Sequence, residues 1–251
     1  MTTTNQPRGR VYDNVLPTPE NNGTYAPIRV DRYGNQYARL LDQFAHAEQG
    51  TLFIAHNATN DASTTLAGHA APVLADADAT MTKPLFFMRN PTSSTKRIIP
   101  LYLELDLVTA GANGTADNWA AQLDTGPTRV TSGGTALTIV NPNMDNANAS
   151  VLAATGALLG GAVVTGAEVD VRELGHGQIR AAIHVAGDRY CFKFGGEPGV
   201  GANVVATAAS RHLINLPPVI LGAEDMFLLA AYAPSQSAAA VYKMRCAWLE
   251  V

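Results

Sequence analysis

The sequence predicts a mainly β protein: a jelly-roll-type antiparallel β-sandwich preceded by an extended N-terminal arm. Two observations favour this fold class. Many short apolar or alternating segments follow one another, each bounded by turn residues, and none has the long 3.6-residue period of an amphipathic helix. The first 35 residues instead carry four prolines and few apolar side chains, so this stretch cannot bury enough surface to fold alone.

The chain is therefore predicted to consist of an arm, residues 1–35, and one β-sandwich (jelly-roll) domain, residues 36–251. The hydrophobic fraction of 47% is enough for a sizeable core. Five arginines and three acidic residues give the first forty residues a charge near +2, whereas the whole chain carries −4. A mildly basic arm on an acidic body suits docking onto an acidic surface.

The clearest strand is predicted over residues 99–107, where apolar residues occupy every second position and Tyr102, Glu104 and Asp106 lie between them. This period of two indicates a strand with one buried face. Pro100 has no N–H to donate to a neighbouring strand, so we expect an edge or a bulge where this strand begins. Further strands are predicted over residues 51–56, 84–89, 129–131, 135–140, 168–174, 178–185, 189–194, 218–221, 226–232 and 241–250.

Glycine-containing connectors separate several of these segments. Residues 132–134, 175–177 and 187–188 are predicted to be short turns of the hairpin type. The segment 141–164 is rich in Asn, Ala and Gly, and it predicts either a long loop or a loop with a short helix near residues 147–158.

The two cysteines are predicted to lie on different kinds of strand face. Cys246 alternates in phase with Tyr242 and Trp248, which makes it a small core residue, whereas Cys191 lies on the face of Arg189. We therefore expect no disulfide between them. The start of the chain is polar and has no signal-peptide pattern, which together with the cysteine usage fits assembly in a reducing cytoplasm.

One motif resembles an enzyme's. Asp76, Asp78 and Thr80 form a DxDxT similar to the nucleophile loop of haloacid-dehalogenase-like phosphatases, in which the first Asp attacks phosphorus. However, Pro72 interrupts the apolar run before it, and the alternation of strands and helices that this fold requires does not follow. We interpret the motif as a solvated acidic loop.

Other patterns of catalytic or metal sites are missing from the sequence. The histidines show no i,i+2 or i,i+4 pairing, His184 is expected at the surface or an interface, and the glycine-rich segment 195–201 lacks the ending of a phosphate loop. The prediction is no enzyme, with no catalytic, cofactor-binding or metal-ligating residue. The longest basic run is Lys96-Arg97 and no apolar run reaches 18 residues, so neither nucleic acid nor a membrane is an expected partner.

Several segments resemble structural proteins of tailed bacteriophages: residues 30–37, 131–135, 141–145, 216–224, 233–237 and 248–250. The pattern of turns and strand ends is similar to that of jelly-roll capsid decoration (cement) proteins. This resemblance implies a bacteriophage virion structural protein on the capsid surface, which is assembled in the host bacterial cytoplasm and binds and stabilises the shell of major capsid protein. It carries no catalytic signature.

The arm supplies the candidate partner-binding residues, Arg8, Arg10, Arg29, Arg32 and Tyr33. Charged residues make up only 15% of the chain, against about 25% in an average soluble protein, which indicates a surface covered by copies of itself. A homotrimer is therefore predicted. The alternative function is a phage tail, spike or fibre-associated protein that contacts a host receptor. A third hypothesis, an enzyme, depends only on Asp76 and Asp78 or on fold analogy.

Overall fold

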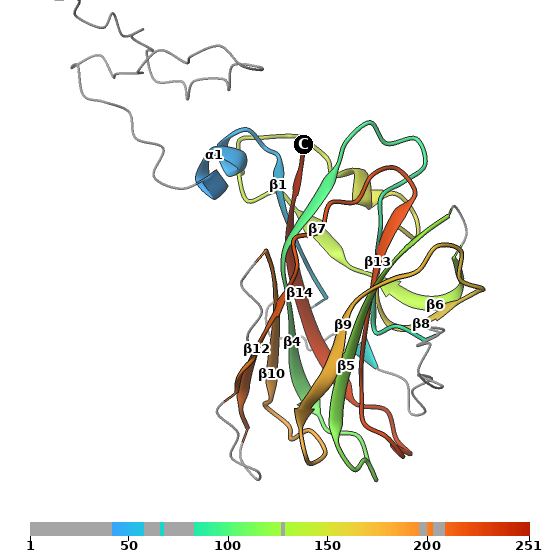
Figure 1. Cartoon of the computed structure of the whole chain (residues 1–251). Coiled ribbons are helices and arrows are strands. Elements are labelled where there is room, and N and C mark those ends of the chain that lie inside the picture. Colours follow the sequence, from blue (N-terminus) through green and yellow to red (C-terminus); the bar gives the residue numbers. More distant parts are fainter. Residues whose placement is uncertain (1–41, 58–65, 68–82, 127–128, 196–199, 203–208) are drawn as a thin grey trace, which may run out of the picture.

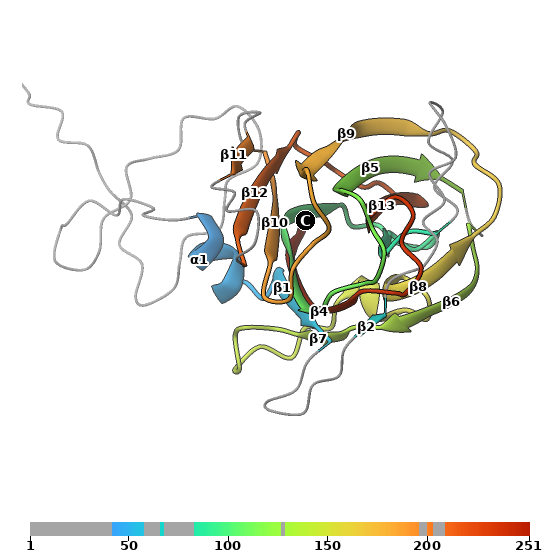
Figure 2. The ribbon, with the colours of Figure 1, turned by 90° about the horizontal axis from the view of Figure 1, so that it is seen from below.

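The computed structural model describes residues 42–57, 66–67, 83–126, 129–195, 200–202 and 209–251, with only the backbone at 42, 66–67 and 200–202. Their strands form a sheet of eight and a sheet of six, which face each other as a sandwich (Figures 1 and 2). The predicted mainly β fold is confirmed. The predicted arm, residues 1–35, and the DxDxT motif at Asp76 lie outside the described residues.

The strands are β1 (Leu52–His56), β2 (Leu66–Ala67), β3 (Phe86–Arg89), β4 (Ile98–Thr109), β5 (Asp117–Thr125), β6 (Val130–Ala136), β7 (Thr138–Val140), β8 (Leu158–Thr165), β9 (Arg172–Arg180), β10 (Arg189–Phe194), β11 (Val200–Ala202), β12 (Arg211–Leu216), β13 (Asp225–Tyr232) and β14 (Val241–Glu250). Two short helices accompany them, α1 (Asp42–Glu48) and the 3-10 helix η1 (Val151–Ala153).

The order of the strands is that of a jelly roll. The eight-stranded sheet runs β11-β12-β10-β4-β14-β1-β7, with β2 also paired to β14, and the six-stranded sheet runs β6-β8-β3-β13-β5-β9. The chain crosses from one sheet to the other between β4 and β5, between β9 and β10, and between β13 and β14. The four neighbouring strands β10-β4-β14-β1 of one sheet and the four neighbouring strands β3-β13-β5-β9 of the other form the eight-stranded jelly roll. Nearly all neighbours are antiparallel, but β10 and β12 are parallel.

The pairing of β4 with β14 explains how a proline lies in a central strand. The register shifts by one residue at this point, because Ala247 pairs with Tyr102 and the next residue, Trp248, pairs with Pro100. The extra residue on β4 makes a bulge, where the missing N–H of proline interrupts no ladder bond. The bulge expected at Pro100 is confirmed.

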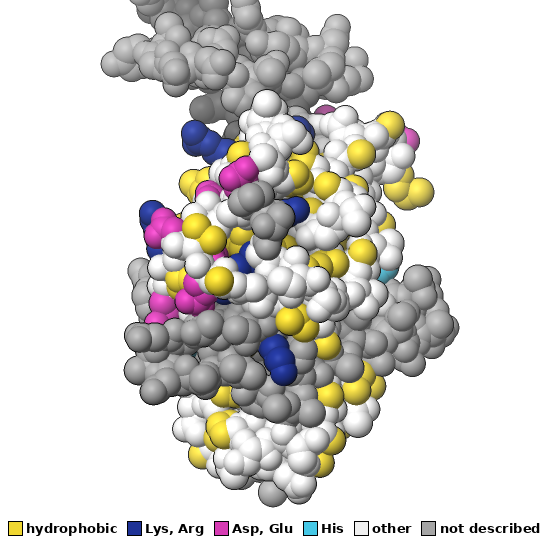
Figure 3. All heavy atoms as spheres, turned by 90° about the vertical axis from the view of Figure 1, so that its right-hand side faces the viewer, with side chains coloured by type: hydrophobic (Ala, Val, Ile, Leu, Met, Phe, Trp, Pro, Cys, Tyr) yellow, Lys and Arg dark blue, Asp and Glu magenta, His cyan; other side chains and the backbone are white. Residues whose placement is uncertain are grey.

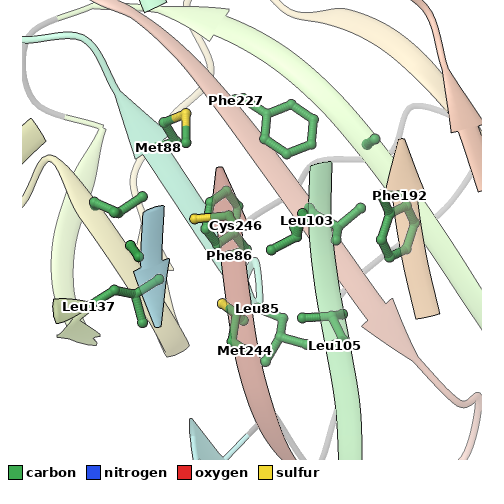
Figure 4. Close-up of a cluster of buried hydrophobic side chains, with 14 of the residues drawn as sticks. Leu85, Phe86, Met88, Leu103, Leu105, Leu137, Phe192, Phe227, Met244 and Cys246 are labelled. Carbon is green, nitrogen blue, oxygen red and sulfur yellow. The ribbon is translucent and has the colours of Figure 1, made fainter. Parts of the chain in front are cut away.

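The main core lies between the two sheets. Figure 4 shows side chains from both sheets pointing toward one another, with Phe86 and Phe227 from the six-stranded sheet and Leu103, Phe192 and Cys246 from the eight-stranded one. Aromatic rings join the sheets, since the ring centroids of Phe194 and Phe227 are 5.1 Å apart and those of Trp119 and Phe192 are 5.8 Å apart. Full burial of each such ring contributes about 2–3 kcal/mol.

The six-stranded sheet is apolar on both faces. Along β13, Phe227 and Leu229 belong to the main core, whereas Met226 and Leu228 belong to a second buried cluster together with Phe87 and Val163. Successive residues of a strand point to opposite faces, so both faces of β13 are buried. This is why residues 226–232 read as a continuous apolar run, whereas β4 alternates.

Several predicted boundaries were wrong. Residues 130–136 form one strand, β6, which passes through the Gly133-Gly134 pair, and β7 lies in the other sheet, so no hairpin joins them. Residues 172–180 likewise form the single strand β9, in which Gly175 and Gly177 pair with Ala121 and Trp119 of β5. Residues 218–221 contribute only an isolated bridge between Ile98 and Leu221. The segment 141–164 contains the short helix η1, which was one of the two predicted alternatives, and also most of β8.

Candidate functional site

The predicted partner-binding residues Arg8, Arg10, Arg29, Arg32 and Tyr33 lie outside the described residues. Candidate sites among the described residues lie at the two ends of the sandwich. We call one end the loop end; it carries the connections 110–116, 181–188 and 233–240 (Figure 1, bottom). The opposite end, the terminal end, carries α1, the connections 141–150, 168–171 and 217–224, and the C-terminal Val251.

At the loop end, Asp188 is the centre of a buried network. Its Oδ2 accepts hydrogen bonds from Arg180 Nη1 at 2.6 Å and from the backbone N–H of Val185 at 2.6 Å, while its Oδ1 accepts from the backbone N–H of Ser210 at 2.8 Å. Asp188 is completely buried and Arg180 is 2% exposed. A carboxylate has about four acceptor positions, so Asp188 uses most of its capacity to hold these segments together.

Asp117, at the start of β5, extends this network. It accepts a hydrogen bond from the hydroxyl of Tyr190, and Nδ1 of His184 lies 3.5 Å from its Oδ1. The backbone N–H of Gly111 donates to Nε2 of His184 at 2.9 Å, so the proton of this imidazole is on Nδ1, facing the carboxylate. Burial, and next the charge of Asp117, raise the pKa of Tyr190 well above its usual value.

His184 was therefore predicted wrongly as a surface or interface residue. It is 1% exposed and lies after the end of β9, so the alternation that placed it on the face of Arg180 does not reach it. Its ring instead connects the segment 110–116 to Asp117. No pattern in the sequence indicates this role, because a histidine in a connector is ordinarily solvated.

His212 is the one member of this region whose ring nitrogens, among the described residues, have no hydrogen-bond partner. It is 1% exposed, and its ring centroid lies 5.3 Å from that of Tyr190, its register partner on β10. Burial lowers the pKa of His212, while Asp188 and Asp117 oppose this shift and Arg180 adds to it. Protonation of His212 thus places a charge in a nearly dry interior.

Residues of these types also occur in acid–base active sites. Here the carboxylates of Asp117 and Asp188 accept hydrogen bonds from the fold itself, and Tyr190, His184 and His212 are each at most 1% exposed. The arrangement holds the connections 110–116 and 181–188 and the backbone at Ser210 in place. It is a structural network, and we assign it no chemistry.

The terminal end differs because large apolar side chains are exposed there. Phe44 on α1 is 71% exposed, Met144 is 98%, Val169 is 69%, Ile220 is 57% and Val251 is 50%. They come from five separate segments of this end, with α1 on one side and the segment 168–171 on the other (Figure 2). Exposed apolar side chains on neighbouring segments, as those of Phe44 and Met144 are, are typical of an interaction surface.

The segment that presents Met144 is held by its asparagines. Within it, the side-chain oxygens of Asn141 and Asn143 accept the backbone N–H groups two residues further on, at 3.0 and 3.1 Å. Asn143 also donates to the carbonyl of Glu48 at 3.1 Å, which ties the loop to the end of α1. The Asn-rich stretch is thus a series of local turns with a defined shape, and Met144 projects from it.

Glu250 anchors the same end from inside. It is 1% exposed and accepts hydrogen bonds from the hydroxyl of Ser150, from the indole Nε1 of Trp248 at 3.1 Å and from the backbone N–H of Val151 at 3.1 Å. Ser150 is also the N-cap of η1. One carboxylate at the end of β14 therefore fixes the connection that precedes β8.

A pocket of about 270 Å³ also opens at the terminal end. Leu123, Ile220 and Leu221 form its apolar part, and Asp170, Arg172 and Asp225 are polar residues of its lining. Figure 3 shows a neighbouring face of the molecule, where acidic side chains gather toward one side and uncharged or apolar atoms cover much of the remainder.

The wall of this pocket is rigid because a buried ion pair supports it. Asp124, at the end of β5, pairs with Arg129, and its Oδ1 accepts the backbone N–H of Asp170 at 2.8 Å. Arg129 also donates from Nε to the carbonyl of Gly166 at 3.1 Å. Burial lowers the pKa of Arg129, and Glu168 opposes this shift. The segment 166–170 is thus held against β5.

The outer face of the eight-stranded sheet carries a compensated charge ladder. Arg245 donates two 2.9 Å hydrogen bonds to Glu104, and Arg189 pairs with both Glu104 and Asp106. These residues are cross-strand neighbours on β14, β4 and β10. Cys191 lies on the same face and Cys246 in the core; both thiols are free, as predicted.

No family model matches the chain, and neither a curated protein nor a solved structure is significantly similar to it. Among the described residues, His, Cys, Asp and Glu side chains form no group of three or more that could hold a metal ion. No helix within the described part of the chain is long and apolar enough to cross a membrane.

Proposed function

We propose that this protein is a bacteriophage virion structural protein, a capsid decoration protein that docks on the shell of major capsid protein through its terminal end. The observation that carries the proposal is the set of exposed apolar side chains at that end, of which Met144 and Phe44 are the most exposed. Bonded turns and a helix present these side chains, so the backbone that carries them loses little conformational entropy on binding.

The jelly-roll fold and the low charge fraction of 15% also support an assembling structural role. In this proposal three copies form a ring, and each copy adds a modest interface to the shell. Once one copy is docked, the others bind at high effective concentration, so weak contacts add up to tight attachment. The basic N-terminal arm adds an electrostatic contribution.

The test is co-sedimentation of the purified protein with undecorated shells. We expect the wild-type chain to sediment with the shells and the Phe44→Asp/Met144→Asp variant to lose at least about tenfold in affinity, because two charges then replace apolar contacts. Val108→Asp is the matched control, since Val108 is a 38%-exposed apolar residue near the loop end. Equal losses in both variants, or none in either, would contradict docking through the terminal end.

Binding to host cells in place of shells would favour the alternative function, a tail, spike or fibre-associated protein that contacts a receptor. The same three proteins can be used in that assay. Light scattering on the free protein tests the predicted homotrimer, for which a mass of one chain at every concentration would be the opposite result.

A further inference from the structure

The pocket at the terminal end has the lining that a long basic side chain requires. Its apolar part, Leu123, Ile220 and Leu221, can cover an aliphatic stem, and the carboxylates of Asp170 and Asp225, which belong to the same lining, can pair with a cationic head. Ile220 is more than half exposed, so the apolar part reaches the surface.

The surroundings of the pocket are acidic. Six acidic residues lie on the segments around it and two arginines oppose them, which leaves an excess of four negative charges before internal pairing. The acidic residues are Asp124, Glu168, Asp170, Glu173, Glu224 and Asp225, and the arginines are Arg129 and Arg172. Arg129 pairs with Asp124 and Glu168, and Arg172 contacts Asp170 at 3.4 Å, so Glu173, Glu224 and Asp225 have no arginine partner within this set.

The chain itself contains a segment of complementary charge. Residues 1–41 carry five arginines and three acidic residues, a net charge of +2, and Arg29 and Arg32 lie among apolar residues in the part nearest the fold. The segment joins α1 at Asp42, on the terminal end. Asp42 is ten positions after Arg32 in the chain, so the distance between them can be up to about 35 Å.

We propose that in the free protein the chain's own N-terminal segment binds in this pocket, with Arg29 and Arg32 facing Asp170 and Asp225. The segment of the same copy is favoured over that of another copy. A segment joined to the body through few residues has an effective concentration on the order of millimolar, whereas other copies are at micromolar concentration in solution. This inference goes beyond the proposed function, because it concerns the isolated protein without any shell.

The experiment is site-specific photo-crosslinking in the full chain. A benzophenone amino acid replaces Ile220 at the mouth of the pocket, and in a control protein it replaces Val108 near the loop end. Equal amounts of ¹⁴N- and ¹⁵N-labelled protein are mixed and irradiated, and the crosslinked peptides are identified by mass spectrometry. The isotope pattern shows whether both peptides come from one copy.

We expect the probe at Ile220 to crosslink to residues 1–41 of the same copy, and the probe at Val108 not to do so. The Arg29→Gln/Arg32→Gln variant should reduce the yield about three- to tenfold, whereas Arg8→Gln/Arg10→Gln should leave it unchanged. Circular dichroism of each variant verifies that the fold is intact. Crosslinks between different copies, crosslinks from Val108 with equal yield, or none from Ile220 would each overturn the proposal. None of these outcomes depends on binding to shells.

Discussion

The two ends of the sandwich solve opposite problems. At the loop end, the ionisable side chains Asp188, Arg180 and Asp117 are buried in one network. This network reaches the connections 110–116 and 181–188 and the backbone at Ser210. At the terminal end, apolar side chains such as Phe44 and Met144 are exposed on structured segments. A fully bonded buried network stabilises one arrangement of the loop end, whereas burial of the exposed apolar surface of the terminal end against a partner would be favourable. We infer that stability is concentrated in the first end and interaction in the second.

Removal of Asp188 is the strongest way to break the loop end. We expect Asp188→Ala to lower the free energy of unfolding by about 3–5 kcal/mol, because the buried charge of Arg180 loses its ion pair with Asp188 and two backbone N–H groups lose their acceptor. Urea denaturation followed by fluorescence measures this. Arg172→Ala, which removes an exposed partner of Asp170, is the control and should cost less than about 1 kcal/mol. Similar losses in the two variants would contradict the comparison.

Glu250 is the corresponding buried carboxylate at the terminal end, and its loss should be smaller. We expect Glu250→Ala to cost about 2–3 kcal/mol, because the hydroxyl of Ser150, the indole of Trp248 and the N–H of Val151 lose their acceptor but no buried cation is stranded. Urea denaturation gives the value. Glu250→Gln retains one acceptor oxygen and should lose about half as much. A cost above that of Asp188→Ala would reverse the order.

His212 gives the loop end a dependence on pH. Burial lowers its pKa, so the folded protein binds fewer protons than the unfolded chain. This contribution to stability is fully present above the ordinary histidine value of about 6.5 and is lost as the pH falls below it. We expect wild type to lose more stability than His212→Phe between pH 7 and pH 5, measured by urea denaturation at each pH. The phenyl ring retains the contact with Tyr190. If the stability of His212→Phe followed the same pH dependence as that of wild type, the buried imidazole would not be the source of the acid sensitivity.

The smallest effect on stability is expected for an exposed residue of the terminal end. Met144→Asp should change the free energy of unfolding by less than about 0.5 kcal/mol, because the side chain is 98% exposed and leaves nothing unpaired in the free protein. Thermal and urea denaturation test this. A loss above 1 kcal/mol would show that Met144 supports the fold, and the docking result with shells would then need a different variant.

The strands predicted most closely are those with a simple apolar pattern. β10 and β14 begin and end where the sequence predicted, and β4 begins and ends within two residues of its prediction, because their apolar residues alternate with charged ones. β13 is buried on both faces and was predicted from its continuous apolar run. β5 was missed because it has neither pattern: Trp119 packs in the main core and Ala120 in the second cluster, but the buried Gln122 and Asp124 interrupt its apolar run. Alternation disappears when a sheet is buried on both sides.

The sequence by itself determined the fold class, the alternation along β4, β10 and β14, an edge or a bulge at Pro100 and the separation of the two thiols, because each of these depends on residues close together in the chain. The tertiary structure alone decided that Asp117, Arg180, Asp188 and His212 meet, and that Phe44, Met144 and Ile220 come to the same end. Those groupings depend on how the strands are arranged in the two sheets. The pairing of β10 with β12, for example, brings Ser210 to Asp188, and because these residues are 22 positions apart in the chain, no local sequence pattern indicates their contact.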